Sequence, residues 1–233
     1  MLARHSLVWL TPAGWRATAA AAAPAHAPAI ELWRGRDWPL VARRNEAMPL
    51  AGEVCLGLAP PPTPGWERDG APDGGARLRI AVRALDAHVA RSAPPLAVAQ
   101  ALAAAPERWR QPLAGLAKDS AGLGPGLNLR VYGSLALQAL TGLDYLRPGS
   151  DIDLLLAPAT PGQLNAGLAL LADYADTLPL DGEVVFPNGE AVAWKEWRAA
   201  SGGQARVLAK SVHGVRLAGV DALLATLATL EPA

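Results

Sequence analysis

Residues 131–156 read VYGSLALQALTGLDYLRPGSDIDLLL, and the pattern of this stretch decides the fold prediction. A short apolar strand, Leu129–Tyr132, runs into the pair Gly133-Ser134. A helical run covers Leu135–Leu143, and a second apolar strand covers Asp151–Leu156. The stretch therefore predicts a strand, a glycine turn, a helix and a return strand.

Two acidic residues open the second strand. Side chains alternate between the two faces of a strand, so Asp151 and Asp153 are expected on one face and Ile152 on the other. Two carboxylates held a few ångströms apart repel each other unless a cation lies between them. Mg²⁺ prefers such oxygen ligands. The alternative is a solvated strand start, because a lone Asp-x-Asp is common in proteins.

The Gly133-Ser134 pair predicts a phosphate site beside these carboxylates. Glycine lets the backbone approach an anion closely, and the N-terminal N–H groups of the following helix attract negative charge. Metal-binding carboxylates beside a phosphate cradle are typical of enzymes that transfer phosphoryl or nucleotidyl groups with two metal ions.

The order of these features resembles the signature of the nucleotidyltransferase superfamily. More narrowly, the stretch is similar to the malonate decarboxylase holo-acyl-carrier-protein synthases, also called phosphoribosyl-dephospho-CoA transferases. RHSLVWL near the start and LDGEVVFPNGEAVAWKEW further on resemble the same family, so the similarity spans most of the chain. The long segment between Gly-Ser and Asp-x-Asp fits a polymerase or an antibiotic-modifying enzyme less well. The residues of the central stretch that carry the resemblance are Gly133, Ser134, Gln138, Leu140, Thr141, Gly142, Tyr145, Ser150, Asp151 and Asp153.

The resemblance implies an α+β fold with a nucleotidyltransferase-like mixed sheet flanked by helices. It also implies a third acidic residue on the strand beside Asp151 and Asp153. Asp181 and Glu183 alternate along the strand candidate Leu180–Phe186 and share a face. We expect Asp181 to complete the catalytic and metal-binding set, because its short side chain suits a tightly held Mg²⁺.

Three further residues are predicted to contact the substrate. Glu183 is the alternative third metal ligand, or it pairs with Lys195 across the predicted hairpin. Lys195 and Lys210 are placed on nearby strands, where they would meet phosphate groups. The alternative for both lysines is a position at the rim of the sheet, with the ammonium group in water.

The resemblance implies one reaction. The chain would transfer a phosphoribosyl-dephospho-CoA group from 2′-(5″-triphosphoribosyl)-3′-dephospho-CoA to a serine of the apo acyl carrier subunit of malonate decarboxylase, and pyrophosphate would leave. Two rivals stay open: a nucleotidyltransferase with another small or carrier-protein acceptor, and a non-catalytic module that binds a nucleotide or a carrier.

Composition limits the other classes of function. Lys and Arg number 21, as do Asp and Glu, so the basic excess of a protein that wraps nucleic acid is missing. No stretch reaches the roughly 20 apolar residues of a membrane span. Cys55 is the only cysteine, which excludes a disulfide framework and fits the reducing cytoplasm.

Pro94-Pro95 suggests a domain boundary. We expect an N-terminal α+β module over residues 1–92, which recognises the donor or the carrier, and a catalytic domain over residues 93–233. Arg43-Arg44 in the module could grip a phosphate or simply end a strand. The other expected elements are strands at Ser6–Leu10, Trp38–Arg43, Glu53–Leu58, Arg77–Val82, Glu190–Trp197 and Val207–Ser211, and helices at Ala17–Ala23, Leu96–Ala105, Glu107–Leu116, Gln163–Ala175 and, capped by Asp221, Ala222–Leu230.

Overall fold

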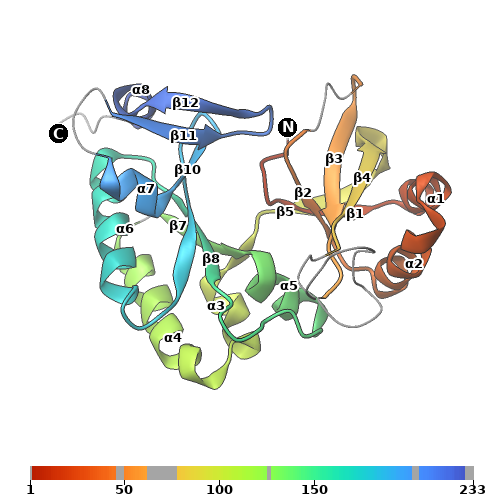
Figure 1. Ribbon diagram of the computed structural model, residues 1–233, viewed down its shortest axis with the longest axis horizontal. Helices are drawn as coiled ribbons and strands as arrows, with labels where there is room; N and C mark the ends of the chain where they lie inside the picture. Colours follow the sequence, from red (N-terminus) through yellow and green to blue (C-terminus); the bar gives the residue numbers. More distant parts are fainter. Residues whose placement is uncertain (1, 46–49, 62–77, 125–126, 201–204, 229–233) are drawn as a thin grey trace. The chain divides into compact units, whose positions relative to one another are not determined.

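The structure is a computed structural model that describes residues 2–45, 50–61, 78–124, 127–200 and 205–228. The chain divides into two compact units. Unit 1 comprises Met1–Pro95 and Leu143–Tyr145, and unit 2 comprises Leu96–Gly142 and Leu146–Ala233. Both units combine helices with a sheet, so the predicted α+β class is confirmed (Figure 1).

Unit 1 is built on a five-stranded antiparallel sheet in the order β4-β3-β2-β1-β5. Its strands are β1 (Leu7–Leu10), β2 (Leu40–Ala42), β3 (Glu53–Leu58), β4 (Ile80–Leu85) and β5 (Val89–Ala93). Its helices are α1 (Pro12–Ala21) and α2 (Ala27–Arg36), with short 3-10 turns η1 (Pro24–His26) and η2 (Asp86–His88).

The core of unit 1 lies between the sheet and its two helices. Alternate residues of β4 are buried, and Trp15 of α1 and Trp33 of α2 pack in the same cluster. Thr11 begins α1 because its hydroxyl accepts a hydrogen bond from Gly14 N at 3.1 Å. Helix α2 was not predicted from the sequence. Pro28 lies in its first turn, where a missing N–H costs nothing.

Two further features of unit 1 concern residues singled out in the sequence. The Arg43 Nε donates a hydrogen bond to the Leu56 carbonyl at 3.1 Å, so this arginine stabilises the sheet.

The Tyr145 hydroxyl donates a hydrogen bond to the Ala59 carbonyl at 2.8 Å, and Tyr145 is 2 % exposed. Tyr145, one of the residues that carry the family resemblance, is therefore a packing residue of unit 1.

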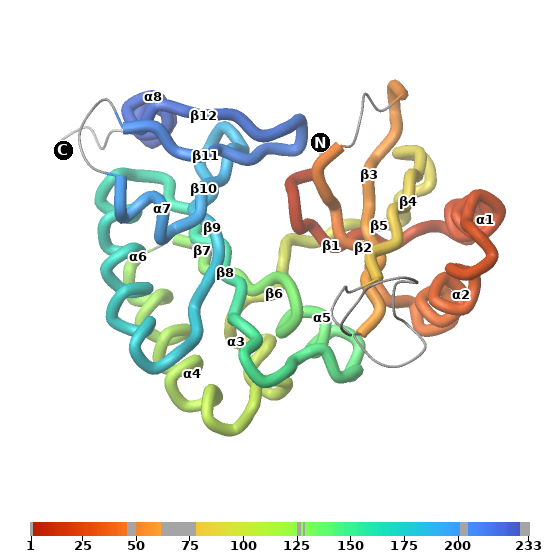
Figure 2. Tube along the Cα trace, in the orientation of Figure 1, coloured from red at the N-terminus to blue at the C-terminus, as the bar shows by residue number. Residues whose placement is uncertain are grey.

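Unit 2 contains a seven-stranded mixed sheet in the order β12-β11-β10-β9-β8-β7-β6, so its strands lie side by side in chain order (Figure 2). Only the β8 and β9 pair is parallel among the described residues. The strands are β6 (Leu96–Ala97), β7 (Asn128–Tyr132), β8 (Ile152–Ala157), β9 (Leu180–Val185), β10 (Ala191–Ala193), β11 (Arg206–Lys210) and β12 (Val215–Gly219).

The helices of unit 2 bury one face of this sheet. Ile152, Leu154 and Leu156 of β8 share a core with Leu164 and Leu171 of α6. Figure 1 shows α4, α6 and α7 along this side of the sheet. None of the helices in the described ranges is both long and apolar enough to cross a membrane. The helices are α3 (Val98–Ala101), with the 3-10 turn η3 (Leu102–Ala104), α4 (Glu107–Gly122), α5 (Gly133–Thr141), α6 (Pro161–Tyr174), α7 (Trp194–Ala199) and α8 (Val220–Leu224).

The strand predicted at Glu190–Trp197 is partly wrong. The strand β10 stops at Ala193, and helix α7 begins at Trp194. Trp194 and Trp197 are both buried, and a spacing of three residues places them on one helix face. Lys195 therefore lies on a helix and not on a strand.

Two smaller predictions also need correction. Asp221 does not cap α8, because this helix already begins at Val220 and Gly219 occupies the cap position. The predicted end of this helix at Leu230 lies outside the described residues, as does Arg77 at the start of the strand predicted there. The helix predicted at Leu96–Ala105 is instead divided among β6, α3 and η3.

Candidate functional site

The candidate site lies on the sheet face of unit 2 that points away from the helix core. Asp153 of β8 and Asp181 of β9 are direct partners in the parallel register, so both side chains project from this face. Asp181 is 47 % exposed at its side chain. The structure thus brings together one residue of the Asp-x-Asp pair and the acidic residue predicted from the neighbouring strand.

Asp151 has a different position from the one predicted. It lies just before β8, exposed, at the exit of a tight turn. In that turn Ser150 N donates to the Arg147 carbonyl at 2.9 Å, and the Ser150 hydroxyl accepts from Arg147 N at 2.8 Å. Gly149 adopts a φ of 82° there, which suits glycine. Asp151 is therefore next to the site but outside the strand ladder.

Gly133 lies directly against the Asp153 carboxylate. It is the first residue of α5 and has a φ of 68°, in the left-handed region. A Cβ atom at this position would overlap the Asp153 carboxylate oxygen. Gly133 therefore makes room for the Asp153 side chain. The sequence analysis predicted only that this glycine would let the backbone approach a phosphate. Ser134, next in the same helical turn, is 5 % exposed.

Gly182, between the two acidic residues of β9, was not singled out in the sequence. A Cβ atom there would overlap the backbone of Leu154, and the φ of Gly182 is 135°. The glycine thus allows β8 and β9 to pair with Asp153 beside Asp181. The available signal was a glycine inside a predicted strand, which often marks a close approach of another backbone.

The two predicted lysines each lie near a carboxylate of β9. Lys210 Nζ donates to Glu183 Oε1 at 3.0 Å, and the Glu183 side chain is only 6 % exposed. Lys195 Nζ lies 3.7 Å from Asp181 Oδ1, so the pairing suggested between Glu183 and Lys195 is replaced by one with Asp181. Lys195 and Lys210 thus place positive charge beside two acidic residues of the same face.

Arg130 is a further cation of this face that the sequence reasoning missed. It is the β7 partner of Leu155, which is in turn the β8 partner of Glu183. Partners in a ladder project to the same side, so Arg130 shares the face of the acidic residues. Arg130 precedes Tyr132 by two residues on β7, so alternation places both on the face of Asp153, the partner of Tyr132.

The acidic residues fit part of a magnesium site. Among the described residues, no three His, Cys, Asp or Glu side chains are gathered closely enough to hold a metal ion by themselves. Mg²⁺ is commonly held by one or two carboxylates, with substrate phosphates and water as the other ligands. Asp153 and Asp181 match that pattern, and the Mg²⁺ assignment stays a prediction.

Gln138 of the central stretch has a structural role. Its Nε2 donates to the Ala104 carbonyl at 2.8 Å, and its Oε1 accepts from Leu146 N at 3.1 Å. Gly142 ends α5 in the left-handed conformation, with a φ of 73°. These contacts anchor the helix that begins at Gly133, and so they position the glycine against Asp153.

Comparisons with known proteins match both halves of the chain to one family. The family model of the phosphoribosyl-dephospho-CoA transferase MdcG C-terminal domain matches residues 96–221, and that of the N-terminal domain matches residues 3–95. A phosphoribosyl-dephospho-CoA transferase of Xanthomonas campestris pv. campestris (strain 8004) is 35 % identical over 219 residues, 93 % of this chain and 94 % of the relative.

Two other relatives carry the same name. The phosphoribosyl-dephospho-CoA transferase of Bradyrhizobium diazoefficiens is 37 % identical over 217 residues, 92 % of this chain and 88 % of the relative. That of Pseudomonas putida (strain GB-1) is 41 % identical over 96 residues, 40 % of this chain and 45 % of the relative. No solved structure matches the chain. The chain therefore belongs to the phosphoribosyl-dephospho-CoA transferase family and is, by that membership, an enzyme of the transferase class.

Proposed function

We propose that this protein transfers the phosphoribosyl-dephospho-CoA group from 2′-(5″-triphosphoribosyl)-3′-dephospho-CoA to a serine of the apo acyl carrier subunit of malonate decarboxylase. The observation that carries the proposal is the pairing of Asp153 with Asp181 on one sheet face, with Gly133 packed against Asp153. Family membership supplies the class of group transferred.

The proposed reaction is a substitution at phosphorus. The serine oxygen forms a bond to the α-phosphorus of the triphosphate, and the bond from that phosphorus to the bridging oxygen breaks. The serine loses its proton, and pyrophosphate leaves with the electron pair of the broken bond. The product is a phosphodiester between the carrier and the phosphoribosyl group.

The residues of the face have distinct proposed roles. Asp153 and Asp181 would hold Mg²⁺, with Asp151 as a further ligand from the adjoining turn. The bound ion would supply positive charge for the attacking and leaving oxygens. Lys195, Lys210 and Arg130 would balance the charge of the triphosphate.

Gly133 and Ser134 begin α5, whose first N–H groups are suited to a phosphate. Glu183 is buried against Lys210, which supports a role in holding that lysine in place. The cytoplasm is the proposed compartment, since Cys55 is the only cysteine and is buried as a thiol.

The experiment is mass spectrometry of the apo carrier after incubation with the enzyme, Mg²⁺ and the triphosphoribosyl donor. The expected result is a carrier heavier by one phosphoribosyl-dephospho-CoA unit, together with release of one pyrophosphate. A carrier in which the acceptor serine is replaced by alanine is the control and should stay unmodified.

Other results would favour the rival functions. An AMP adduct from ATP, in place of the expected adduct, would indicate a nucleotidyltransferase of different specificity. Donor binding without any adduct on the carrier would indicate a non-catalytic module.

A further inference from the structure

The last two strands of the unit 2 sheet expose an apolar surface. Among the described residues, five large hydrophobic side chains are exposed, and three of them lie on the β11–β12 hairpin: Leu208 (40 %), Val215 (42 %) and Leu217 (62 %). Leu208 and Leu217 are direct cross-strand partners. Single exposed apolar residues need no explanation, but a contiguous group on a regular element often marks an interaction site.

This surface is on the same sheet face as the candidate site. Lys210 of β11 is the partner of Val215 on β12 and of Ala191 on β10, and Ala191 is the partner of Val185 on β9. Val185 lies an even number of residues from Asp181, so the two share a face. At the usual strand spacing of about 4.8 Å, the hairpin is about 10 to 15 Å from Asp181.

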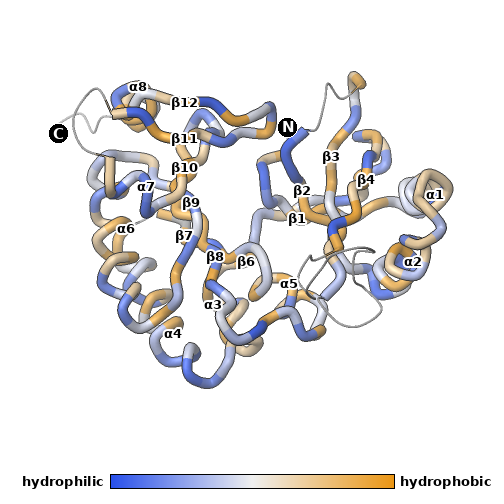
Figure 3. Tube along the Cα trace, viewed as in Figure 1, coloured by the Kyte–Doolittle hydropathy of each residue, from blue (hydrophilic) through white to orange (hydrophobic). Residues whose placement is uncertain are grey.

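All charged side chains of the hairpin are basic, and two of them are ion-paired with acidic residues of neighbouring segments: Lys210 with Glu183 and Arg216 with Glu190. Residues 205–219 read ARVLAKSVHGVRLAG and contain Arg206, Lys210 and Arg216 but no acidic residue, whereas the whole chain has no net charge. Arg206 and Lys210 flank Leu208 on the apolar face by alternation. Hydrophilic and hydrophobic residues lie side by side along this hairpin in Figure 3. Such a surface suits an acidic partner that also offers an apolar patch.

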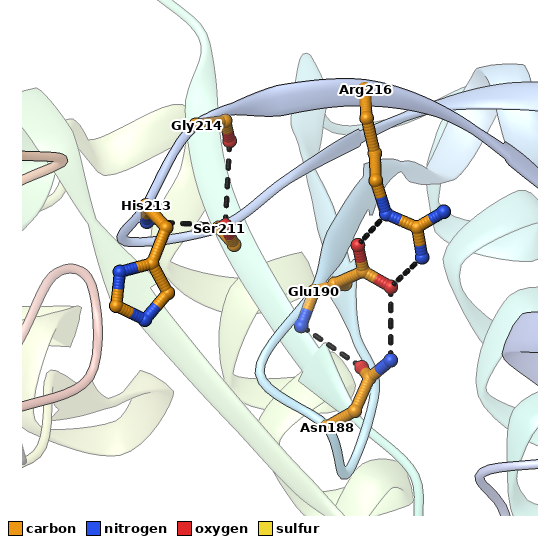
Figure 4. Close-up of polar contacts among 6 residues, drawn as sticks. All are labelled: Asn188, Glu190, Ser211, His213, Gly214 and Arg216. Atoms are coloured by element: carbon orange, nitrogen blue, oxygen red, sulfur yellow. Dashed lines mark hydrogen bonds and ion pairs between the residues drawn. The ribbon is translucent and has the colours of Figure 1, made fainter.

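A charged cluster holds the hairpin in place (Figure 4). Arg216 Nε and Nη2 donate to the two Glu190 carboxylate oxygens at 2.5 and 2.6 Å, and Asn188 Nδ2 donates to Glu190 at 2.9 Å. The turn of the hairpin is closed by Ser211 N, which donates to the Gly214 carbonyl at 2.8 Å. The exposed leucines are therefore presented on a braced element, which reduces the entropy lost on binding.

From these observations we infer that the exposed face of the β11–β12 hairpin, formed by Arg206, Leu208, Val215 and Leu217, is the docking surface for an acidic carrier protein that presents its serine to Asp153 and Asp181. The inference rests on the proposed function. A macromolecular acceptor needs contacts beyond the reacting serine, and this surface lies within the width of a small domain from the carboxylates.

The test is steady-state transfer with the full chain, in which the concentration of the apo carrier is varied at saturating donor. Leu217→Glu and Arg206→Glu should each raise the KM for the carrier by about tenfold or more, a size expected for residues central to an interface. The KM for the donor and kcat at saturating carrier should stay within about twofold, because neither residue belongs to the catalytic site. Asp173→Lys, a charge reversal at an exposed position of α6 in unit 2, is the control and should leave every constant unchanged.

The outcomes separate this inference from the proposed function. Transfer by the wild type with an unchanged carrier KM in both variants overturns the docking surface and leaves the proposed function standing. No transfer by the wild type overturns both. Sedimentation of the wild type as a dimer that Leu217→Glu dissociates, without a change in carrier KM, assigns the surface to a second copy of the chain. If Leu217→Glu does not fold, as judged by circular dichroism, the charge reversal at Arg206 decides the matter.

Discussion

At the scale of single residues, the central finding is that Asp153 and Asp181 face each other across two parallel strands. We expect Asp153→Asn and Asp181→Asn each to lower kcat on the order of a hundredfold or more, since an activating metal supplies several kcal/mol to the transition state. Both variants should keep nearly the stability of the wild type, because the repulsion between the carboxylates is relieved and the exposed ion pair of Asp181 with Lys195 contributes little.

Single-turnover transfer measures this effect, and chemical denaturation measures stability. Asp173→Asn, in an exposed position of α6, is the control and should change neither. Glu183→Gln tests the alternative third ligand. If Glu183→Gln were inactive while Asp181→Asn kept its rate, Glu183 and not Asp181 would complete the site.

Gly133→Ala should damage the enzyme in two ways. A non-glycine residue in the left-handed region costs about 1–2 kcal/mol, and the new Cβ atom would displace the Asp153 carboxylate. Gly142→Ala is a matched control, because Gly142 has a similar φ of 73° but open space around its Cβ position. Both variants should lose comparable stability in urea titrations, whereas only Gly133→Ala should lose most of its kcat. Equal kcat losses would show that the overlap with Asp153 is irrelevant.

At the scale of elements, the sequence predicts the strands and helices that depend on a short stretch of residues. The order of β7, α5 and β8 follows from residues 129–156, and β3 has the bounds predicted for it. The sequence also predicts correctly that Asp181 lies on the strand that pairs with β8. The alternating pattern does not show that β10 ends and α7 begins at Trp194. Trp194 and Trp197 are buried by tertiary contacts, such as the tilted contact of Phe186 with Trp197, whose ring centroids are 4.8 Å apart.

Contacts between distant elements could not be read from the sequence. The pairing of Lys210 with Glu183 depends on the register across β9, β10 and β11. The strand β8 begins at Ile152, one residue after the predicted start at Asp151. The strand β12 was missed because its short alternating pattern places leucine and valine toward solvent.

The Glu190–Arg216 pair makes the stability of the hairpin depend on pH. Hydrogen bonds from Arg216 hold the pKa of Glu190 below its usual value, although burial alone would raise it. A carboxyl with a lowered folded-state pKa stabilises the fold above its unfolded pKa of about 4.3, and this contribution is lost as the pH falls through the folded value. Glu190→Gln should therefore be less stable than the wild type at pH 7 by about 1–3 kcal/mol, the usual cost of losing hydrogen bonds to a charged group.

Urea denaturation of the wild type and Glu190→Gln between pH 7 and pH 3 tests this prediction. The difference in unfolding free energy should be constant down to about pH 5 and shrink below about pH 4.3. Glu31→Gln is the control, since Glu31 pairs with Arg34 at an exposed position of α2 and should matter little. A difference that stays constant down to pH 3 would show that the charge of Glu190 does not stabilise the fold.

At the scale of the whole molecule, acidic and basic residues are concentrated in different parts of unit 2, although the chain has no net charge. The chain has no net charge, yet the face of β8 and β9 gathers acidic residues and the β11–β12 hairpin is basic. A chain without net charge is expected to attract nucleic acid weakly, and its local charges would be available for the proposed metal, triphosphate and carrier. Binding of metal and phosphate should consequently depend on each other.

This dependence leads to a prediction that needs no turnover. In the proposed site Asp153 and Asp181 would supply only part of the ligands of Mg²⁺, so the ion alone should bind weakly. Pyrophosphate alone should also bind weakly, because the carboxylates offset the attraction of the lysines beside them. Together they should bind well, and a ligand that binds only the folded state at about 100 times its Kd adds about 2.7 kcal/mol of stability. Thermal unfolding should therefore show a change in Tm on the order of 1 °C when either Mg²⁺ or pyrophosphate is added alone. The Tm should rise by several degrees when both are added.

Asp153→Asn and Asp181→Asn should abolish the rise in Tm with Mg²⁺ and pyrophosphate, and Asp173→Asn should retain it. Ca²⁺ in place of Mg²⁺ should give a smaller rise, because Ca²⁺ prefers more ligands at longer distances than two carboxylates and a pyrophosphate offer. If Mg²⁺ alone raised Tm as much as the mixture, the protein would hold the ion with a complete ligand set of its own. If the mixture raised the Tm of Asp153→Asn and the wild type equally, metal and phosphate would bind elsewhere, and the paired carboxylates would have another role.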